Sequence, residues 1–235
     1  METDRTTPPS EGIARRGSAV ALVATAITYG VNPLIIPPLL LWLVLDGVEA
    51  PAAETAVMVV AALLLLSVVP ALFLVWMVHS GRSVSLNLED RRHRTRALAI
   101  GLAGAAALMI LAWLTLSRGR DLVMAVLIVY VVGTCILILI NRQWKISLHA
   151  ASAAGFFAVI AFVRGTGSVT APAFAVEPLV FGVVTVVIVC AVAWARLKLR
   201  AHTPGQVLAG AAVGFLVPYF LLSLINTIRP LADTG

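Results

Sequence analysis

The chain has 235 residues, of which 60% are hydrophobic and 12% are charged, and its formal net charge is +6. Soluble domains have about a quarter of their residues charged, so this composition excludes a water-soluble protein and leaves no room for a separate soluble domain. The basic residues are divided among short segments and form no continuous stripe, which argues against nucleic acid as a partner. Cys135 and Cys190 lie within apolar segments and indicate neither a disulfide nor a metal site.

The hydropathy pattern predicts an all-α, polytopic transmembrane bundle with about seven spans, because each crossing needs about 20 apolar residues. Residues 1–16 are polar and predict a disordered cytoplasmic tail. The transmembrane domain is expected over residues 17–226, around a six-helix core, and residues 227–235 are expected to form a C-terminal tail.

The first span, residues 17–45, is interrupted by Asn32 and by prolines that predict a bend, since a proline removes a backbone hydrogen bond that lipid cannot replace. In the last span, Gly210 and Gly214 form a small-xxx-small pair, which predicts close packing against a neighbouring helix. The other spans are expected at residues 52–78, 97–116, 122–140, 147–163 and 173–195, and the last at 203–225.

Three short polar segments stand at the starts of the third, fifth and seventh spans. Because two crossings separate each segment from the next, all three are expected on one side of the membrane. That side carries most of the 17 basic residues, so the positive-inside rule places it in the cytoplasm. Richness in Ala, Val and Arg hints at a GC-rich bacterial genome, and thus at a bacterial inner (plasma) membrane. The segments are RRHRTR at residues 91–96, RQWKISLH at 142–149 and RLKLRAHTPGQ at 196–206.

These segments place two histidines, His149 and His202, at or near the starts of the fifth and seventh spans, among arginines. One neutral imidazole can attack phosphorus, while the other protonates the departing alkoxide and later activates water. Arginines hold the nonbridging oxygens and match the charge of the transition state. The sequence therefore predicts a site for an anionic headgroup, most simply a lipid phosphate. No metal or other cofactor is expected, because Glu89 and Asp90 are too few and too local for a magnesium site.

The spacing of these residues resembles three motifs of the type 2 phosphatidic acid phosphatase family, which includes lipid phosphate and prenyl diphosphate phosphatases. The family motifs are Lys, six residues, Arg-Pro; then Pro-Ser-Gly-His; then Ser-Arg, five residues, His, three residues, Asp. The resemblance covers the third to seventh spans in order, with each motif at the helix expected from the family. In this chain the corresponding segments are Asn87 to Thr95, Ile146-Ser147-Leu148-His149, and Ala195-Arg196 through His202 to Gln206.

The resemblance implies a role for each matching position. His202 would be the nucleophile, and His149 would be the general acid for the leaving group. Arg94, Arg196 and Ser147 would bind the phosphate. The implied activity is metal-independent hydrolysis of a phosphatidate, a prenyl phosphate or a prenyl diphosphate through a phospho-histidine intermediate.

The chain departs from the family motifs at several positions. Asn87 replaces the lysine of the first motif, and Arg91 is expected to supply that charge from the same loop. Ile146 and Leu148 replace the proline and glycine of the second motif. Gln206 replaces the aspartate that orients the nucleophile. Its oxygen can accept the Nδ1–H bond of a histidine but cannot stabilise imidazolium by charge, so a slower or differently tuned enzyme is expected.

Other interpretations stay open. The same set of arginines and histidines could bind or translocate a lipid phosphate without hydrolysing it. A small-solute transporter would need polar groups at mid-membrane depth, and the spans offer few beyond Asn32. The candidate residues also have structural interpretations: the arginines of 91–96 can hold a loop on anionic lipid, Ser147 can cap the fifth span, and Gln206 can form a capping box with Thr203.

Overall fold

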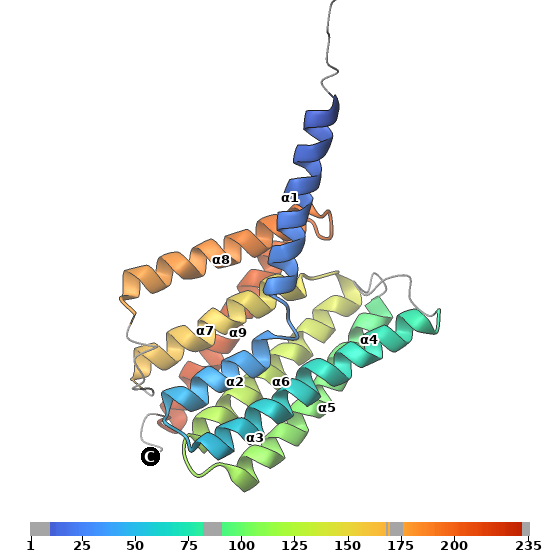
Figure 1. Cartoon of the computed structure of the whole chain (residues 1–235). Helices are drawn as coiled ribbons and strands as arrows, with labels where there is room; N and C mark the ends of the chain where they lie inside the picture. The colour runs from blue at the N-terminus through green and yellow to red at the C-terminus, as the bar shows by residue number, and fades with distance from the viewer. Residues whose placement is uncertain (1–9, 82–90, 168, 170–175, 232–235) are drawn as a thin grey trace, which may run out of the picture.

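The computed structural model describes residues 10–81, 91–167, 169 and 176–231, and it places side chains for residues 19–81 and from residue 95 onward within these ranges. In this part of the chain most residues are helical and none is in a strand, which confirms the predicted all-α fold. The predicted N-terminal tail lies outside the described residues up to residue 9, and the first helix begins at Ser10. The elements are α1 (Ser10–Gly30), α2 (Ile36–Gly47), α3 (Ala52–Ala62), the π-helical η1 (Leu63–Val68), α4 (Val69–His79), α5 (Arg91–Thr115), α6 (Arg120–Gln143), α7 (Leu148–Thr166), α8 (Pro178–Lys198) and α9 (Pro204–Ile228) (Figure 1).

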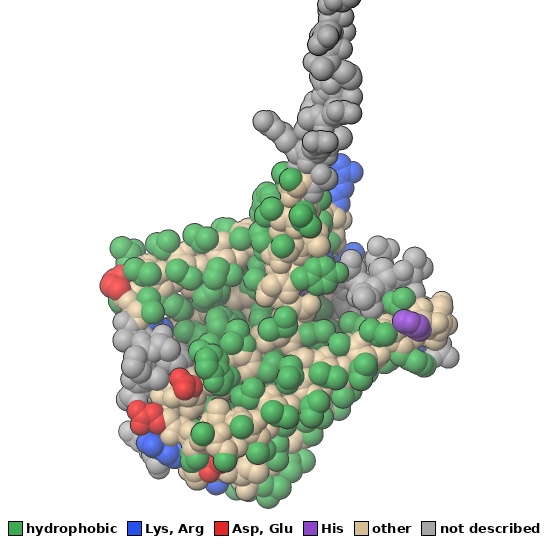
Figure 2. All heavy atoms as spheres, viewed as in Figure 1, with side chains coloured by type: hydrophobic (Ala, Val, Ile, Leu, Met, Phe, Trp, Pro, Cys, Tyr) green, Lys and Arg blue, Asp and Glu red, His purple; other side chains and the backbone are tan. Residues whose placement is uncertain are grey.

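Six helical runs in the described residues are long and apolar enough to cross a membrane, which suggests an integral membrane protein. They are α3–η1–α4, α5 from Thr95 onward, and α6 to α9. Figure 2 shows hydrophobic side chains over the flanks of the bundle, as expected for surfaces that face lipid. The predicted boundaries agree within a few residues except at the starts of α5, which begins at Arg91 instead of residue 97, and α8. That helix begins at Pro178 instead of residue 173, where the Glu177 carboxylate accepts the N–H of Val180 and caps the first turn.

The predicted first span is two helices in the structure instead of one bent crossing. Pro33, Pro37 and Pro38 cause the break, because none of them has an N–H to continue the helical ladder. The 12 residues of α2 correspond to about 18 Å of rise, whereas a hydrocarbon layer is about 30 Å thick. The break therefore lies at membrane depth. Before it, α1 leaves the bundle at a steep angle and packs against α8 (Figure 1).

The break, residues 31–35, is called the elbow below. Asn32 Oδ1 accepts the N–H of Leu34 at 2.9 Å, and the buried Ser67 hydroxyl donates to the carbonyl oxygen of Leu34. Ser67 belongs to η1, so the wider turn of this π-helix faces the elbow. Lipid offers neither donors nor acceptors, so nonhelical backbone at this depth needs such partners. The elbow is thus held against the bundle by these hydrogen bonds, with residues 31–34 partly buried and Ile35 exposed.

The helices α7 and α9 pack backbone against backbone. A Cβ atom at Gly214 would lie 2.1 Å from the carbonyl oxygen of Ala151, and one at Gly210 would lie 2.5 Å from that of Ser147. Only glycine fits at either position, which confirms the predicted close packing of this pair. A backbone hydrogen bond of 3.2 Å from the Ser147 N–H to the Gln206 carbonyl oxygen ties the start of α7 to the first turn of α9.

Acidic and basic side chains gather at one end of the bundle, where the C-terminus also lies (Figures 1 and 2). There the Glu54 carboxylate accepts from the N–H and the hydroxyl of Ser117, and Arg229 pairs with Asp121. At the opposite end, residues near the starts of α5 and α7, the end of α8 and His202 just before α9 all border one cavity. The structure thus brings the three polar segments to the same end of the bundle, as the count of spans predicts.

Candidate functional site

A cavity of about 410 Å³ extends from the polar end of the bundle toward its middle. Arg196, His149 and His202 line it at the polar end. The rest of the wall comes from the elbow and from residues of α1, α2, η1, α4, α5, α6, α7 and α9. Residues that are far apart along the chain therefore line one cavity, and the roles predicted for these three residues at a bound phosphoryl group stay predictions.

Arg196 is the buried cation of this cavity. It lies in the last turn of α8 with 5% of its surface exposed. Its Nε is buried and has no hydrogen-bond partner among the described residues. Leaving a buried donor unpaired costs about 1–3 kcal/mol, and more for a charged group. An oxyanion in the cavity would remove this cost, because guanidinium binds carboxylate and phosphate oxygens in a planar fork.

The chain turns from α8 into α9 through a Schellman motif. The N–H of Arg200 donates to the Leu197 carbonyl oxygen at 2.9 Å, and that of Ala201 donates to the Arg196 carbonyl oxygen at 3.1 Å. Arg200 itself has the left-handed φ of 51°. This turn leaves His202 buried in the cavity wall, two residues before α9 begins.

Gln206 makes both of the interactions that the sequence allows for it. It forms a capping box with Thr203, in which Gln206 Oε1 accepts the Thr203 N–H at 3.2 Å. The same Oε1 lies 3.1 Å from Nδ1 of His202. Because the Thr203 N–H fixes the position of the amide oxygen, His202 Nδ1 must be the donor, and Nε2 holds the lone pair of the neutral ring. The amide therefore orients the imidazole without supplying a full negative charge.

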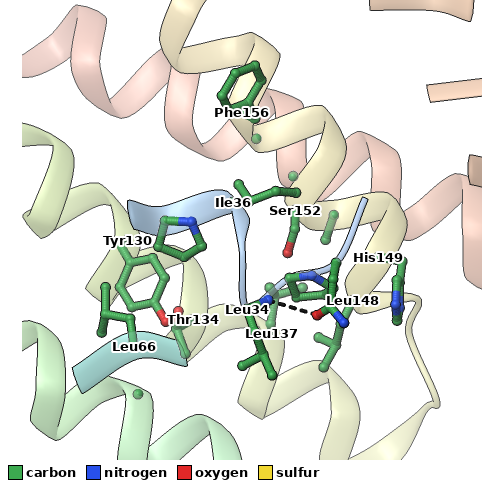
Figure 3. Close-up of a pocket in the computed structure, with 18 of the residues that line it drawn as sticks. Leu34, Ile36, Leu66, Tyr130, Thr134, Leu137, Leu148, His149, Ser152 and Phe156 are labelled. Atoms are coloured by element: carbon green, nitrogen blue, oxygen red, sulfur yellow. Dashed lines mark hydrogen bonds between the residues drawn. The ribbon is translucent and has the colours of Figure 1, made fainter. Parts of the chain in front are cut away.

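Ser147 begins α7 as its N-cap, with its Oγ accepting the Ala150 N–H at 3.4 Å, which confirms the predicted cap. Ser147 is fully buried and is not among the residues found in the cavity wall, so its phosphate contact stays a prediction. His149 and Ser152 follow on one face of α7, three residues apart, and both line the cavity (Figure 3).

Deeper in the bundle the cavity wall is mostly apolar. Figure 3 shows Leu66, Leu137 and Phe156 around it. Tyr130 and Thr134 are polar exceptions, and their side chains are hydrogen-bonded to each other along α6. A cavity with ionisable groups at one end and apolar walls beyond suits a ligand with a charged head and a hydrocarbon tail.

The predicted phosphate ligands Arg91 and Arg94 lie at the start of α5, and their side chains are outside the described residues, as is Asn87. Ala97 and Leu98, about one turn further along α5, line the cavity. The start of α5 therefore borders the site, and the phosphate contacts of the two arginines stay predictions.

Sequence analysis does not single out Ser152 or the elbow as parts of the site. The signal for Ser152 is its position three residues after His149, which puts both side chains on one face of a helix. The signal for the elbow is Asn32 beside Pro33, a polar residue and a helix breaker inside an apolar span. Both are visible in the sequence, but neither indicates which other helix it faces.

Trp144 flanks the site from the connector between α6 and α7. A Cβ atom at Gly205, in the first turn of α9, would lie 3.5 Å from Cζ2 of this indole. The ring is also 43% exposed, as is usual for tryptophan at a membrane surface. An exposed tryptophan beside the mouth of the site is the feature expected of a site that opens near the lipid headgroups.

Residues 141–230 match the family model of the PAP2 superfamily. The match begins at the end of α6 and continues just past α9, so it contains His149, Arg196 and His202. None of the curated proteins and none of the solved structures matches the chain. The part of the chain that supplies the ionisable groups of the cavity is thus similar to the PAP2 superfamily, and this similarity supports a phosphatase that hydrolyses phosphoric esters.

Proposed function

We propose that the protein is an integral membrane phosphatase that hydrolyses the phosphomonoester or diphosphate of a lipid. The observation that carries the proposal is the buried, unpaired Nε of Arg196 in a cavity that both His149 and His202 also line. The PAP2 match supports the reaction class. The apolar depth of the cavity supports a phosphatidate, a prenyl phosphate or a prenyl diphosphate as substrate, with the headgroup on the cytoplasmic side.

In the first step His202 acts as the nucleophile. Its Nδ1–H is held by Gln206, so Nε2 presents its lone pair to phosphorus. The Nε2–P bond forms as the bond from phosphorus to the leaving oxygen breaks. His149, protonated at the outset, gives its proton to that oxygen, and the lipid alcohol or lipid monophosphate leaves.

In the second step a water molecule attacks the phosphorus of the phospho-histidine. The neutral His149 takes a proton from this water, and the N–P electron pair returns to His202 Nε2 as free phosphate forms. Arg196, with Arg91, Arg94 and Ser147, would bind the nonbridging oxygens and stabilise their charge in both transition states. None of these bond changes requires a metal ion.

The test is phosphate release by the purified protein in lipid nanodiscs, in the presence of a chelator, from one lipid of each candidate class. His202→Ala is expected to lower kcat by roughly 10⁴-fold or more, because the N–P bond of the first step can then no longer form at residue 202. A labelled phosphate attached through nitrogen, labile in acid and stable in base, should be trapped on the wild type only. His79→Ala is the matched control, since His79 is exposed at the end of α4 and bonds to the Val75 carbonyl oxygen. Release that survives in His202→Ala would refute the mechanism.

One observation favours a second function, which is binding or translocation of a lipid phosphate without hydrolysis. Gln206 gives His202 an oriented but uncharged partner, which is a weaker support for an imidazolium than a carboxylate. Gln206→Glu keeps the chain length and the capping box and adds the charge. The phosphatase proposal predicts that kcat rises about tenfold or more in this variant. If the wild type binds lipid phosphates but releases no phosphate, with or without the substitution, the binding function is the correct one.

A further inference from the structure

His202 lines two hollows. One is the lipid-facing cavity described above, and the other is a hollow of about 540 Å³ at the polar end of the bundle. The second hollow is formed by the connector between α6 and α7 and by the chain around the start of α9. Its lining residues lie at or beyond the ends of the candidate membrane spans. The imidazole therefore stands between a space suited to lipid and a space open to water.

The second hollow has the composition of an anion site. Lys145 and Arg200 line it together with Thr203 and Gln206, and no carboxylate is among the lining residues that the structure describes. The first turn of α9, with its partial positive charge, forms another part of the wall. Two cations, a helix start and an imidazole favour a small oxyanion over a neutral solute.

The backbone at Arg200 is an independent indication that its side chain is needed there. This residue occupies the left-handed position of the Schellman motif that ends α8, where glycine is usual because it has no Cβ to strain. A cation is not required at this position to complement the end of α8, because Lys198 in the last turn already serves that purpose. The chain thus accepts a strained arginine next to the hollow where an unstrained glycine would end the helix equally well.

A second Schellman motif in the same protein shows what a charged residue at this position can do. Glu49, with φ of 53°, ends α2 in the same way, and its carboxylate pairs with Arg118 at 4.0 Å. Arg200 has no carboxylate partner among the described residues. Within the described part of the chain, Arg200 therefore offers the hollow a cation for which the structure gives no counterion.

We propose that the second hollow binds the inorganic phosphate that the reaction releases, so that lipid enters from the apolar cavity and phosphate leaves past His202 into the basic hollow. This inference rests on the proposed phosphatase function for the origin of the phosphate. The binding itself requires no turnover, because Lys145 and Arg200 would hold phosphate supplied from solution.

The test is binding of labelled inorganic phosphate to the full-length protein in nanodiscs of zwitterionic lipid. Arg200→Gly and Lys145→Gln are each expected to raise the Kd of phosphate about threefold to fivefold, as for a partly exposed ion pair. Lys198→Gln is the matched control, since Lys198 is exposed, lies two residues before Arg200 and lines neither hollow. Arg200→Gly should also raise the midpoint of thermal unfolding, because it relieves the left-handed strain. A merely structural arginine would not give this combination of greater stability and weaker phosphate binding.

The proposal would be overturned if Arg200→Gly and Lys198→Gln lost phosphate binding equally. It would also be overturned if Arg200→Gly and Lys145→Gln both bound phosphate as tightly as the wild type. A second arm uses vesicles that contain a lipid phosphomonoester in place of free phosphate. If Arg200→Gly weakens binding of the lipid ester as much as that of free phosphate, the hollow belongs to the headgroup site and the exit is refuted. A protein that releases no phosphate from any lipid refutes the proposed function alone, because the binding arm still reports on the hollow.

Discussion

Two of the regions that line the deep cavity, α7–α9 and α1–α4, are built in different ways. In α7–α9 the backbones touch at Gly210 and Gly214, and a backbone hydrogen bond joins the start of α7 to the first turn of α9. In α1–α4 the chain contains a helix break and a π-helix, and single side chains such as Ser67 hold the elbow. The first region supplies His149, Arg196 and His202, and the second supplies the elbow and much of the apolar wall.

This difference indicates a division of labour. Reacting groups must be held within a fraction of an ångström, which direct backbone contact between two helices achieves. A wall for a hydrocarbon tail needs only the right volume and polarity. A helix break held by a few side-chain hydrogen bonds is therefore precise enough for this wall. The PAP2 match lies on the α7–α9 side of this division. We therefore expect substitutions in α7–α9 to affect all substrates alike, and substitutions in α1–α4 to change which tail is preferred.

The largest expected effect is on Arg196. Arg196→Ala should lower kcat/KM for every lipid phosphate by about 100- to 1000-fold, as for loss of one donor to a developing oxyanion. Arg196→Lys keeps the charge but loses the planar fork, and should fall between the wild type and the alanine variant. The measurement is kcat/KM for a long-tailed and a short-tailed substrate. A loss confined to one of the two would contradict the proposed division.

Gly214→Ala is the next strongest change. The added methyl would overlap the Ala151 carbonyl oxygen, and forcing the two helices apart should cost about 3 kcal/mol of stability. Thermal unfolding in nanodiscs measures the effect. Gly182→Ala on α8 is the control, because a Cβ atom there meets nothing within 4 Å. Equal unfolding temperatures for the two variants would show that the close contact of α7 and α9 is not essential.

Ala71→Phe tests the other region. Ala71 lines the cavity from α4, and a phenyl ring there would occupy part of the space for the tail. We expect kcat/KM for a long-tailed lipid phosphate to fall about tenfold relative to a short-tailed one. Leu72→Phe, on the adjacent residue that faces outward with 61% exposure, should leave this ratio unchanged. If kcat/KM fell equally for the long-tailed and the short-tailed substrate, α4 would belong to the elements that hold the reacting groups.

The smallest effect is expected from Ser67→Ala. This change removes the donor to the Leu34 carbonyl oxygen, and leaving this partly buried acceptor unpaired should cost about 1 kcal/mol. Ser223→Ala removes a similar hydroxyl bond to a carbonyl oxygen on the exposed side of α9 and should cost less. Comparison of the two unfolding midpoints checks the prediction, and a larger shift for Ser223→Ala would show that the elbow does not depend on η1.

The sequence predicts the features of this protein that depend on local pattern or on counting. Parity of the spans brings His149 and His202 to one end, small residues at positions 210 and 214 predict the contact of two helices, and Gln206 has the spacing of both a cap and a histidine partner. The rest depends on tertiary contacts. Prolines predict a bend near residue 33 but not the direction that α1 then takes, and nothing in the sequence of η1 indicates a wider helical turn. The left-handed backbone of Arg200 was equally hidden, since arginine gives no conformational signal of the kind that glycine gives.

The contact of Trp144 with the first turn of α9 gives the protein an intrinsic optical reporter. This indole lies over Gly205, one residue before the glutamine that orients His202. Its fluorescence should respond when a ligand fills the mouth of the site, whereas Trp42 and Trp113 are exposed residues outside the cavity wall and should provide a constant background. Replacing the other four tryptophans with phenylalanine would leave a single emitter with which occupancy can be followed in real time without any added label.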